Sequence, residues 1–127
     1  MASVHAISAS KTSHFDSVSV FNQQRLQAIH NNVDKAKWSY LIANNIVFKQ
    51  AYSHCIKLNM PATEQLVIWL EKLISGGQCA NIFVEHVVLD EMSQARLTQL
   101  CIMHNVNLIN VTTHQHGEVV KGPWLDS

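Results

Sequence analysis

The residues in this chain that could do chemistry are mainly histidines, of which there are eight. His114 and His116 lie two positions apart, so on a strand both rings would point to the same side, as two zinc ligands do. Two imidazoles supply only half of a tetrahedral zinc site, and we expect a solvated tail here and no metal. His104 falls on the apolar face of a predicted helix, where a core or helix-capping role is expected.

Glu85 and His86 form the second candidate, because they follow a predicted strand. Ligands of open α/β sheets usually bind at the carboxyl ends of strands, so the two side chains could act as an acid/base pair. The alternative is a solvated loop, which we favour, and no Ser lies in a Gly-x-Ser-x-Gly turn. We therefore predict no catalytic residue and keep a small hydrolase or transferase as a lesser alternative.

A nucleotide cofactor is not expected either. The predicted alternation of strands and helices from residue 37 to 113 contains only Gly76 and Gly77, which end a helix. Gln78 and Cys79 follow them, where a phosphate-binding loop requires Lys and then Ser or Thr. This favours a protein that binds other macromolecules over a nucleotide-dependent enzyme.

Composition narrows the class of partner. The chain has 127 residues, 47% of them hydrophobic and 14% charged, with a formal net charge of zero. Nucleic acid is therefore not expected as the main partner, because phosphate contacts need clustered Lys and Arg. The near-zero net charge makes a homodimer plausible. Three widely spaced cysteines, together with the lack of an apolar run long enough for a membrane span, predict a reduced cytoplasmic protein with no membrane contact.

These chemical groups must be positioned by a small α/β fold. Residues 18–113 are predicted to form one domain, a mostly parallel sheet of about four strands flanked by helices, resembling a truncated RecA-like fold. Residues 1–17 are expected to be a flexible tail, and residues 114–127 a tail or an edge strand near 118–121. The predicted strands are 38–43, 55–59, 80–84 and 106–112, and the direction of the first pair is left open. The predicted helices are 21–31, 47–53, one that begins at Pro61 or Thr63 and ends before Gly76-Gly77, and 91–104 with Asp90 as an N-terminal cap.

Aromatic and basic residues cluster around the first predicted strand and the short helix after it. Such side chains are the usual anchors of protein interfaces. Core burial is the alternative for Trp38 and Phe48, whereas Tyr52 and Lys37 are the better candidates for exposure. The full set is Lys37, Trp38, Phe48, Tyr52, His54 and Lys57.

The order of these segments resembles the SulA family of SOS-induced cell-division inhibitors, whose RecA-like sheet lacks a nucleotide-binding loop. The likeness covers residues 37–113, beginning with Lys37-Trp38 at the head of the first strand. It continues through Cys55-Ile56-Lys57-Leu58-Asn59, the helix from Thr63 to Leu70 before Ser75-Gly76-Gly77, the strand Asn81-Ile82-Phe83-Val84-Glu85, the helix start Leu89-Asp90-Glu91, and Asn107-Leu108-Ile109-Asn110-Val111. These are patterns of hydrophobicity and capping more than invariant motifs.

The resemblance implies a function without catalysis. Members of the family bind the tubulin-like division protein FtsZ and block its polymerisation. By resemblance, the surface that faces FtsZ would include Lys37 and Trp38, an aromatic residue of the next helix (Phe48 or Tyr52), and a basic position at the second strand (His54 or Lys57). That helix is shorter here than the family pattern, and the C-terminus shows no family degradation signal. An adaptor subunit in DNA-damage tolerance is the alternative.

Overall fold

Five parallel strands form the central sheet of the computed structural model, which describes residues 14–31, 36–113 and 119–127. The strand order is β1-β6-β5-β2-β4, so β5 lies in the middle, with β1 and β4 at the edges. The bounds are β1 Phe15–Ser19, β2 Trp38–Ile42, β4 Cys55–Leu58, β5 Cys79–Glu85 and β6 Asn107–Thr112. All four pairings between neighbours are parallel, including β2 with β4, the pair whose direction the sequence left open.

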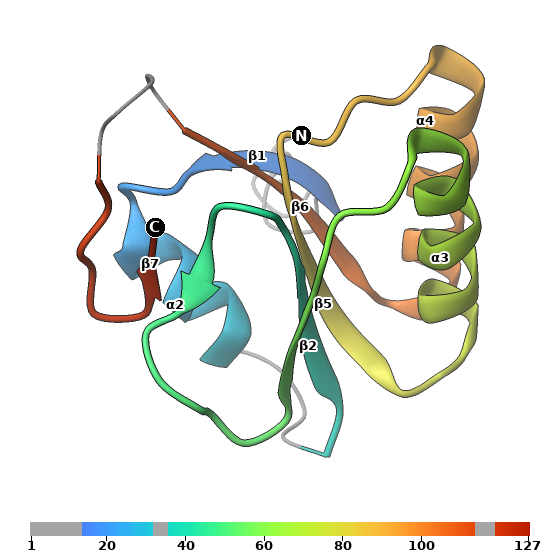
Figure 1. Cartoon of the computed structure of the whole chain (residues 1–127). Helices are drawn as coiled ribbons and strands as arrows, with labels where there is room; N and C mark the ends of the chain where they lie inside the picture. Colours follow the sequence, from blue (N-terminus) through green and yellow to red (C-terminus); the bar gives the residue numbers. More distant parts are fainter. Residues whose placement is uncertain (1–13, 32–35, 114–118) are drawn as a thin grey trace, which may run out of the picture.

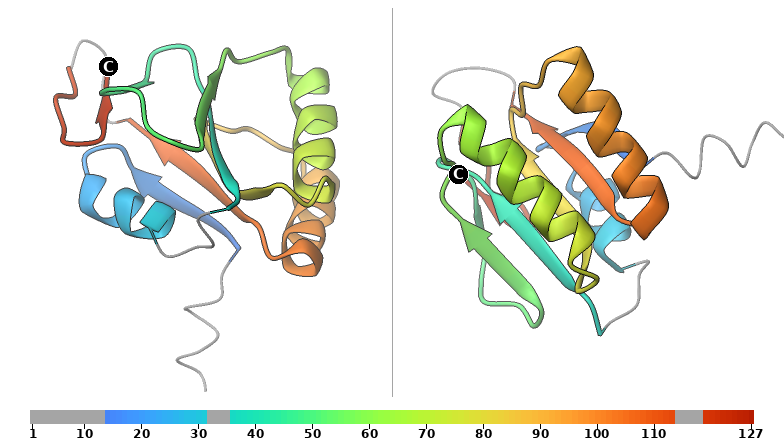
Figure 2. Two further views of the ribbon diagram at one scale, coloured as in Figure 1. Left: turned by 90° about the horizontal axis from the view of Figure 1, so that it is seen from below. Right: turned by 90° about the vertical axis from the view of Figure 1, so that its right-hand side faces the viewer.

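Helices cover both faces of this sheet. Helices α3 (Thr63–Ser75) and α4 (Glu91–His104) pack side by side on one face, and α2 (Gln23–Asn31) lies on the other with the C-terminal segment (Figure 1). The views in Figure 2 show the same three layers, with the sheet between the two helical layers. The apolar core is divided accordingly, with one buried cluster on each side of the sheet. The predicted class, a mostly parallel α/β sheet with flanking helices, is confirmed.

Local sequence explains where the two long helices begin and end. In α3, Leu66, Leu70 and Ile74 recur at helical spacing and are buried, which is why this helix has a clear apolar face. At the start of α4, the Asp90 carboxylate accepts a hydrogen bond of 2.7 Å from the Ser93 backbone amide, as predicted for a cap. At its end, Asn105 takes a left-handed conformation with φ 55°.

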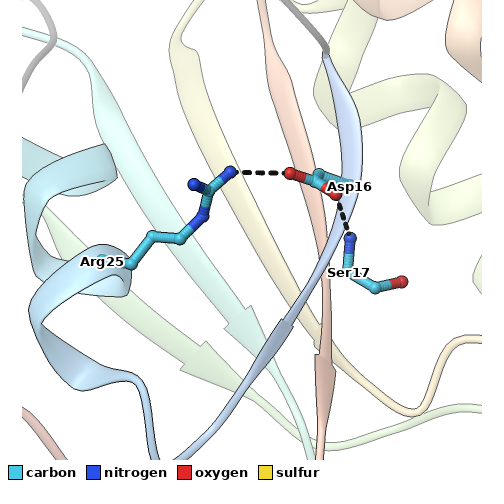
Figure 3. A network of polar contacts seen from close by, with 3 residues as sticks. All are labelled: Asp16, Ser17 and Arg25. Carbon is cyan, nitrogen blue, oxygen red and sulfur yellow. Dashed lines mark hydrogen bonds and ion pairs between the residues drawn. The ribbon is translucent and has the colours of Figure 1, made fainter. Parts of the chain in front are cut away.

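The predicted N-terminal tail is wrong at its last residues, because Phe15–Ser19 forms the edge strand β1 beside β6. Val18 is buried there, and Arg25 of α2 pairs with Asp16 at 2.7 Å (Figure 3). The serine content of this stretch concealed two apolar residues that pack on the core, Val18 on the α2 side and Phe15 on the side of α3 and α4. The rest of the predicted tail, residues 1–13, lies outside the described residues.

The predicted helix at 47–53 is also wrong. Val47–Phe48 is a short strand, β3, which pairs antiparallel with β7 (Leu125–Asp126). The C-terminal segment therefore is not a solvated tail, since Trp124 and Leu125 are each 1% exposed. Lys121 makes a single bridge to Asp126, and the start of the edge strand predicted near residue 118 lies outside the described residues. Pairing with distant residues, which local periodicity does not report, decided the structure of residues 47–53.

Candidate partner-binding surface

One group of the predicted interface residues lies at the amino ends of the strands. Trp38 begins β2, and its ring packs against that of His54 with centroids 4.8 Å apart. His54 is exposed in the turn that precedes β4 and has a positive φ of 59°. Lys37 comes directly before Trp38 and is half-buried. Trp38, His54 and Lys37 thus form an aromatic and basic corner, which we call the amino-end group.

A second group lies in the connection between β2 and β4. Phe48 and Tyr52 meet edge to face with centroids 6.0 Å apart, and both are half-buried against the core cluster on the α2 side. The Tyr52 hydroxyl donates a hydrogen bond of 3.2 Å to the Pro123 carbonyl. We call Phe48 and Tyr52 the loop aromatics. Their packing leaves only part of each ring open to a partner.

The edge strand β4 lies between these groups. Lys57 is paired in register with Leu41, so its side chain is on the α2 side of the sheet, whereas His54 precedes the strand in a turn. The Lys57 ammonium donates to the Asn59 side chain at 2.7 Å. Among the described residues, no strand pairs with the outer edge of β4. The six predicted residues therefore are divided among the amino ends of the strands, the connection packed on the α2-side core, and the edge strand β4.

The C-terminal segment holds the loop aromatics in place, and the sequence analysis did not predict this. Trp124 lies 5.5 Å from the Phe48 ring and 5.2 Å from Phe83, and it stacks on His30 at 5.4 Å. The Gln23 side chain fastens the segment from α2. Its carbonyl accepts from the backbone amides of Trp124 and Leu125 at 2.9 and 2.8 Å, and its amide donates to the Leu125 carbonyl at 2.7 Å.

A tryptophan followed by leucine in a presumed tail was the available signal for this contact. Large apolar side chains near a terminus are seldom left in water when a core is within reach. Gln23 carried no such signal, because a glutamine on a helix is ordinarily exposed. Trp124 and Gln23 hold the loop aromatics in place but are not themselves part of the candidate surface.

Beneath the surface, polar side chains are linked across the sheet. His30 Nδ1 lies 2.7 Å from the Ser39 hydroxyl, which accepts from the Asn81 side-chain amide at 3.2 Å. Asn81 in turn accepts from Asn107 at 2.9 Å. Burial lowers the pKa of His30, so its ring is held in the neutral form. These bonds fix β2, β5, β6 and α2 relative to one another.

None of the three thiols has the character of a nucleophile. Cys55 lies 3.8 Å from His30 Nε2, yet burial raises the pKa of the Cys55 thiol. Burial also raises the pKa of Cys79 and of Cys101 to about 12. A thiol must ionise to attack or to bind a metal, so these environments suit the structural cysteines that the sequence predicted.

Glu85 and His86 do not meet as an acid/base pair. The Glu85 carboxylate accepts hydrogen bonds from the Asn44 and Asn45 backbone amides, both at 2.9 Å. His86 Nε2 instead accepts from the Thr113 backbone amide at 3.2 Å. Each side chain is thus occupied in holding a turn at the carboxyl end of the sheet.

The sequence also predicts that the protein has no metal site and no membrane span. Among those residues, no three His, Cys, Asp or Glu side chains are grouped as metal ligands would be. The His114 and His116 pair lies outside them. No described helix is both long and apolar enough to span a bilayer.

Comparisons with known proteins bear on the fold. No protein-family model and no curated protein matches the sequence. Among solved structures, the crystal structure of SulA from Pseudomonas aeruginosa is similar, with a TM-score of 0.55 and 11% sequence identity. The match covers 80% of this chain and 99% of the SulA chain. The resemblance predicted from the order of segments is confirmed at the level of fold, and this chain has the fold of SulA.

Proposed function

We propose that this protein is a non-enzymatic, cytoplasmic inhibitor of cell division that acts in the SOS response to DNA damage. It binds FtsZ and prevents its polymerisation. The observation that carries the proposal is a fold like that of SulA, with aromatic and basic side chains on β2, on the open edge strand β4 and in the connection between them. Trp38, His54 and Tyr52 are the anchors, and Lys37 and Lys57 supply positive charge.

The geometry supports binding more than catalysis. The side chains that chemistry would need are tied into turns or buried as neutral thiols. By contrast, His54 is exposed beside the half-buried Trp38 ring, an arrangement that offers a partner both an apolar surface and a hydrogen-bonding ring. Phe48 contributes mainly by supporting Tyr52.

Sedimentation of FtsZ assembled with GTP tests the proposal directly. The full chain in molar excess should reduce the polymer yield in a stoichiometric manner. Losing a central aromatic anchor typically costs about 2 kcal/mol, so Tyr52→Ala or His54→Ala should weaken inhibition by about 30-fold. Lys57→Ala should have a smaller effect, and Lys72→Ala is its matched control because Lys72 is an exposed lysine on α3.

Unchanged polymer yield with the folded wild-type chain would refute the proposal. In that case, capture of recombinase or polymerase partners would favour the adaptor alternative instead. Equal effects of Lys57→Ala and Lys72→Ala would show that Lys57 does not belong to the interface.

A further inference from the structure

A pocket of about 300 Å³ opens at the carboxyl ends of the strands, at the opposite end of the sheet from Trp38 and His54. Its walls come from the turns that follow β2, β4 and β5. The connection after β2 runs to β4 on one side, and the connection after β5 runs through α4 to β6 on the other. Parallel sheets bind their ligands at such a divergence of neighbouring connections.

The polar group where these connections diverge is a carboxylate of the protein itself, that of Glu85. Glu85, the last residue of β5, is 7% exposed. Its Oε1 accepts from two consecutive backbone amides, those of Asn44 and Asn45. Successive backbone amides of this kind are what a bound phosphate uses elsewhere. Here they are already occupied by the Glu85 carboxylate, whose negative charge would repel a phosphate.

The same carboxylate retains capacity for one more donor. From the part of the chain that the structure describes, Glu85 Oε2 accepts one hydrogen bond, 3.2 Å from Asn45 Nδ2, although each oxygen of an ionised carboxylate can accept about two. Among the described residues the ion pairs join Arg25 to Asp16 and Arg96 to Glu71, and neither involves Glu85. A largely buried carboxylate without a cationic partner is a favourable site for a cation.

The other side chains that line the pocket indicate what kind of molecule would bear the cationic group. Beside Glu85, the pocket is lined on its apolar part by Met60, Pro61, Leu66 and Val88 and on its polar part by Asn44, Asn45, Thr63 and His86. These apolar side chains suit a short hydrocarbon stem, and methionine adapts its shape to such a stem. A volume of this size is at the lower end for small-molecule sites, which fits a ligand of a few heavy atoms.

We propose that this pocket binds a primary ammonium group on a short alkyl stem, with the ammonium donating to Glu85 Oε2 and the stem packing on Met60, Leu66 and Val88. A free alkyl amine and the lysine side chain of a partner protein share this chemistry. The site is separate from the surface proposed to bind FtsZ, so it stands whether or not that function is correct.

Titrations of the full chain, followed by ¹H–¹⁵N NMR, test the site with three probes that differ only in the polar end. n-Butylammonium should shift the Asn44 and Asn45 amide resonances saturably, with a Kd in the millimolar range expected for so small a ligand. n-Butanol should bind at least about tenfold more weakly, because it lacks the charge, and butyrate should not bind. If butanol or butyrate matches n-butylammonium, or if no probe gives saturable shifts, the proposal is wrong.

Two variants test whether the negative charge that binds the ammonium group is that of Glu85. Glu85→Gln should weaken n-butylammonium binding by about tenfold or more, whereas Glu91→Gln removes an equal charge from an exposed position and should leave it unchanged. Equal loss in both variants would overturn the site. Should Glu85→Gln fail to fold, the comparison of probes on the wild-type chain still decides. A blocked lysine that binds more tightly than n-butylammonium identifies a partner's lysine as the ligand, and the reverse order identifies a free amine.

Discussion

The attachment of the C-terminal segment to α2 gives the sharpest test of how this fold is held together. Gln23 is 5% exposed and makes three hydrogen bonds with the backbone of Trp124 and Leu125. In Gln23→Ala, the Trp124 and Leu125 amides lose the Gln23 acceptor, and the Leu125 carbonyl keeps its bond from the Gly122 amide. Each such buried group left unsatisfied costs about 1–3 kcal/mol. Water entering the vacated space relieves part of this, and we expect a net loss of about 2–4 kcal/mol.

The measurement is urea unfolding at constant pH, followed by tryptophan fluorescence. Gln24→Ala is the matched control, because Gln24 is the next residue of the same helix and is exposed, so its loss should change the free energy of unfolding by less than about 0.5 kcal/mol. Amide hydrogen exchange should also show loss of protection at Trp124 and Leu125 in Gln23→Ala only. If the two variants unfold at the same urea concentration, Gln23 does not hold the segment.

Gly122 provides an independent check on the same contact. A Cβ atom at this position would lie 2.0 Å from Gln23 Cδ, so an alanine must displace the amide that makes the three bonds. Gly122→Ala should therefore destabilise the fold nearly as much as Gln23→Ala. In the Gln23→Ala background, the same change should add little, and fully additive effects would contradict this account.

Three further outcomes follow from the structure. Trp124→Ala should lower the free energy of unfolding by about 3–5 kcal/mol, measured by chemical denaturation, because it empties the centre of the core cluster on the α2 side. Because burial lowers the pKa of His30 below its usual 6.5, the stability it supports is complete above that value and is lost as pH falls through the lowered pKa; His30→Gln should flatten this part of the stability profile, and an unchanged profile would exclude His30. In the native protein, a small alkylating reagent should modify Cys55 before Cys79 and Cys101, whose thiol pKa values burial raises to about 12, and mass spectrometry of early time points would reveal any other order.

Local sequence was sufficient to predict the elements whose own periodicity or caps define them. The stripe of Leu66, Leu70 and Ile74 and the capping carboxylate of Asp90 act within a few residues of themselves. The largely apolar segment of β5, buried at every position from Cys79 to Glu85 although Asn81 and Glu85 are polar, likewise is typical of a central parallel strand. From these, the fold class could be predicted correctly.

The errors arose where distant residues decide the outcome. Val47 and Phe48 become a strand because Leu125 and Asp126 lie opposite them, nearly eighty positions away in the chain. Phe15–Ser19 becomes a strand because β6 offers an open edge and α2 an ion pair. No periodic signal within a stretch of two or five residues can report such a partner.

The types of residue in the candidate surface could be predicted from the sequence, but their arrangement in space could not. The aromatic and basic residues near β4 were identifiable by type and proximity in sequence, yet Lys57 lies on the α2 side of this strand, whereas His54 precedes the strand in a turn with positive φ. A partner that binds both residues would also meet the open edge of β4. Backbone pairing along that edge would supply affinity, with Trp38 and Tyr52 giving specificity on either side.

The two ends of the sheet are consequently suited to different partners. At the carboxyl end, where a parallel sheet ordinarily receives an anionic ligand, Glu85 already occupies the backbone amides of Asn44 and Asn45. The carboxylate satisfies the same kind of donors that a phosphate would use, so a phosphate would meet occupied amides and a like charge there. The amino end is then free to carry Trp38 and His54 without the constraints of a cofactor, and a sheet of this type can serve recognition alone.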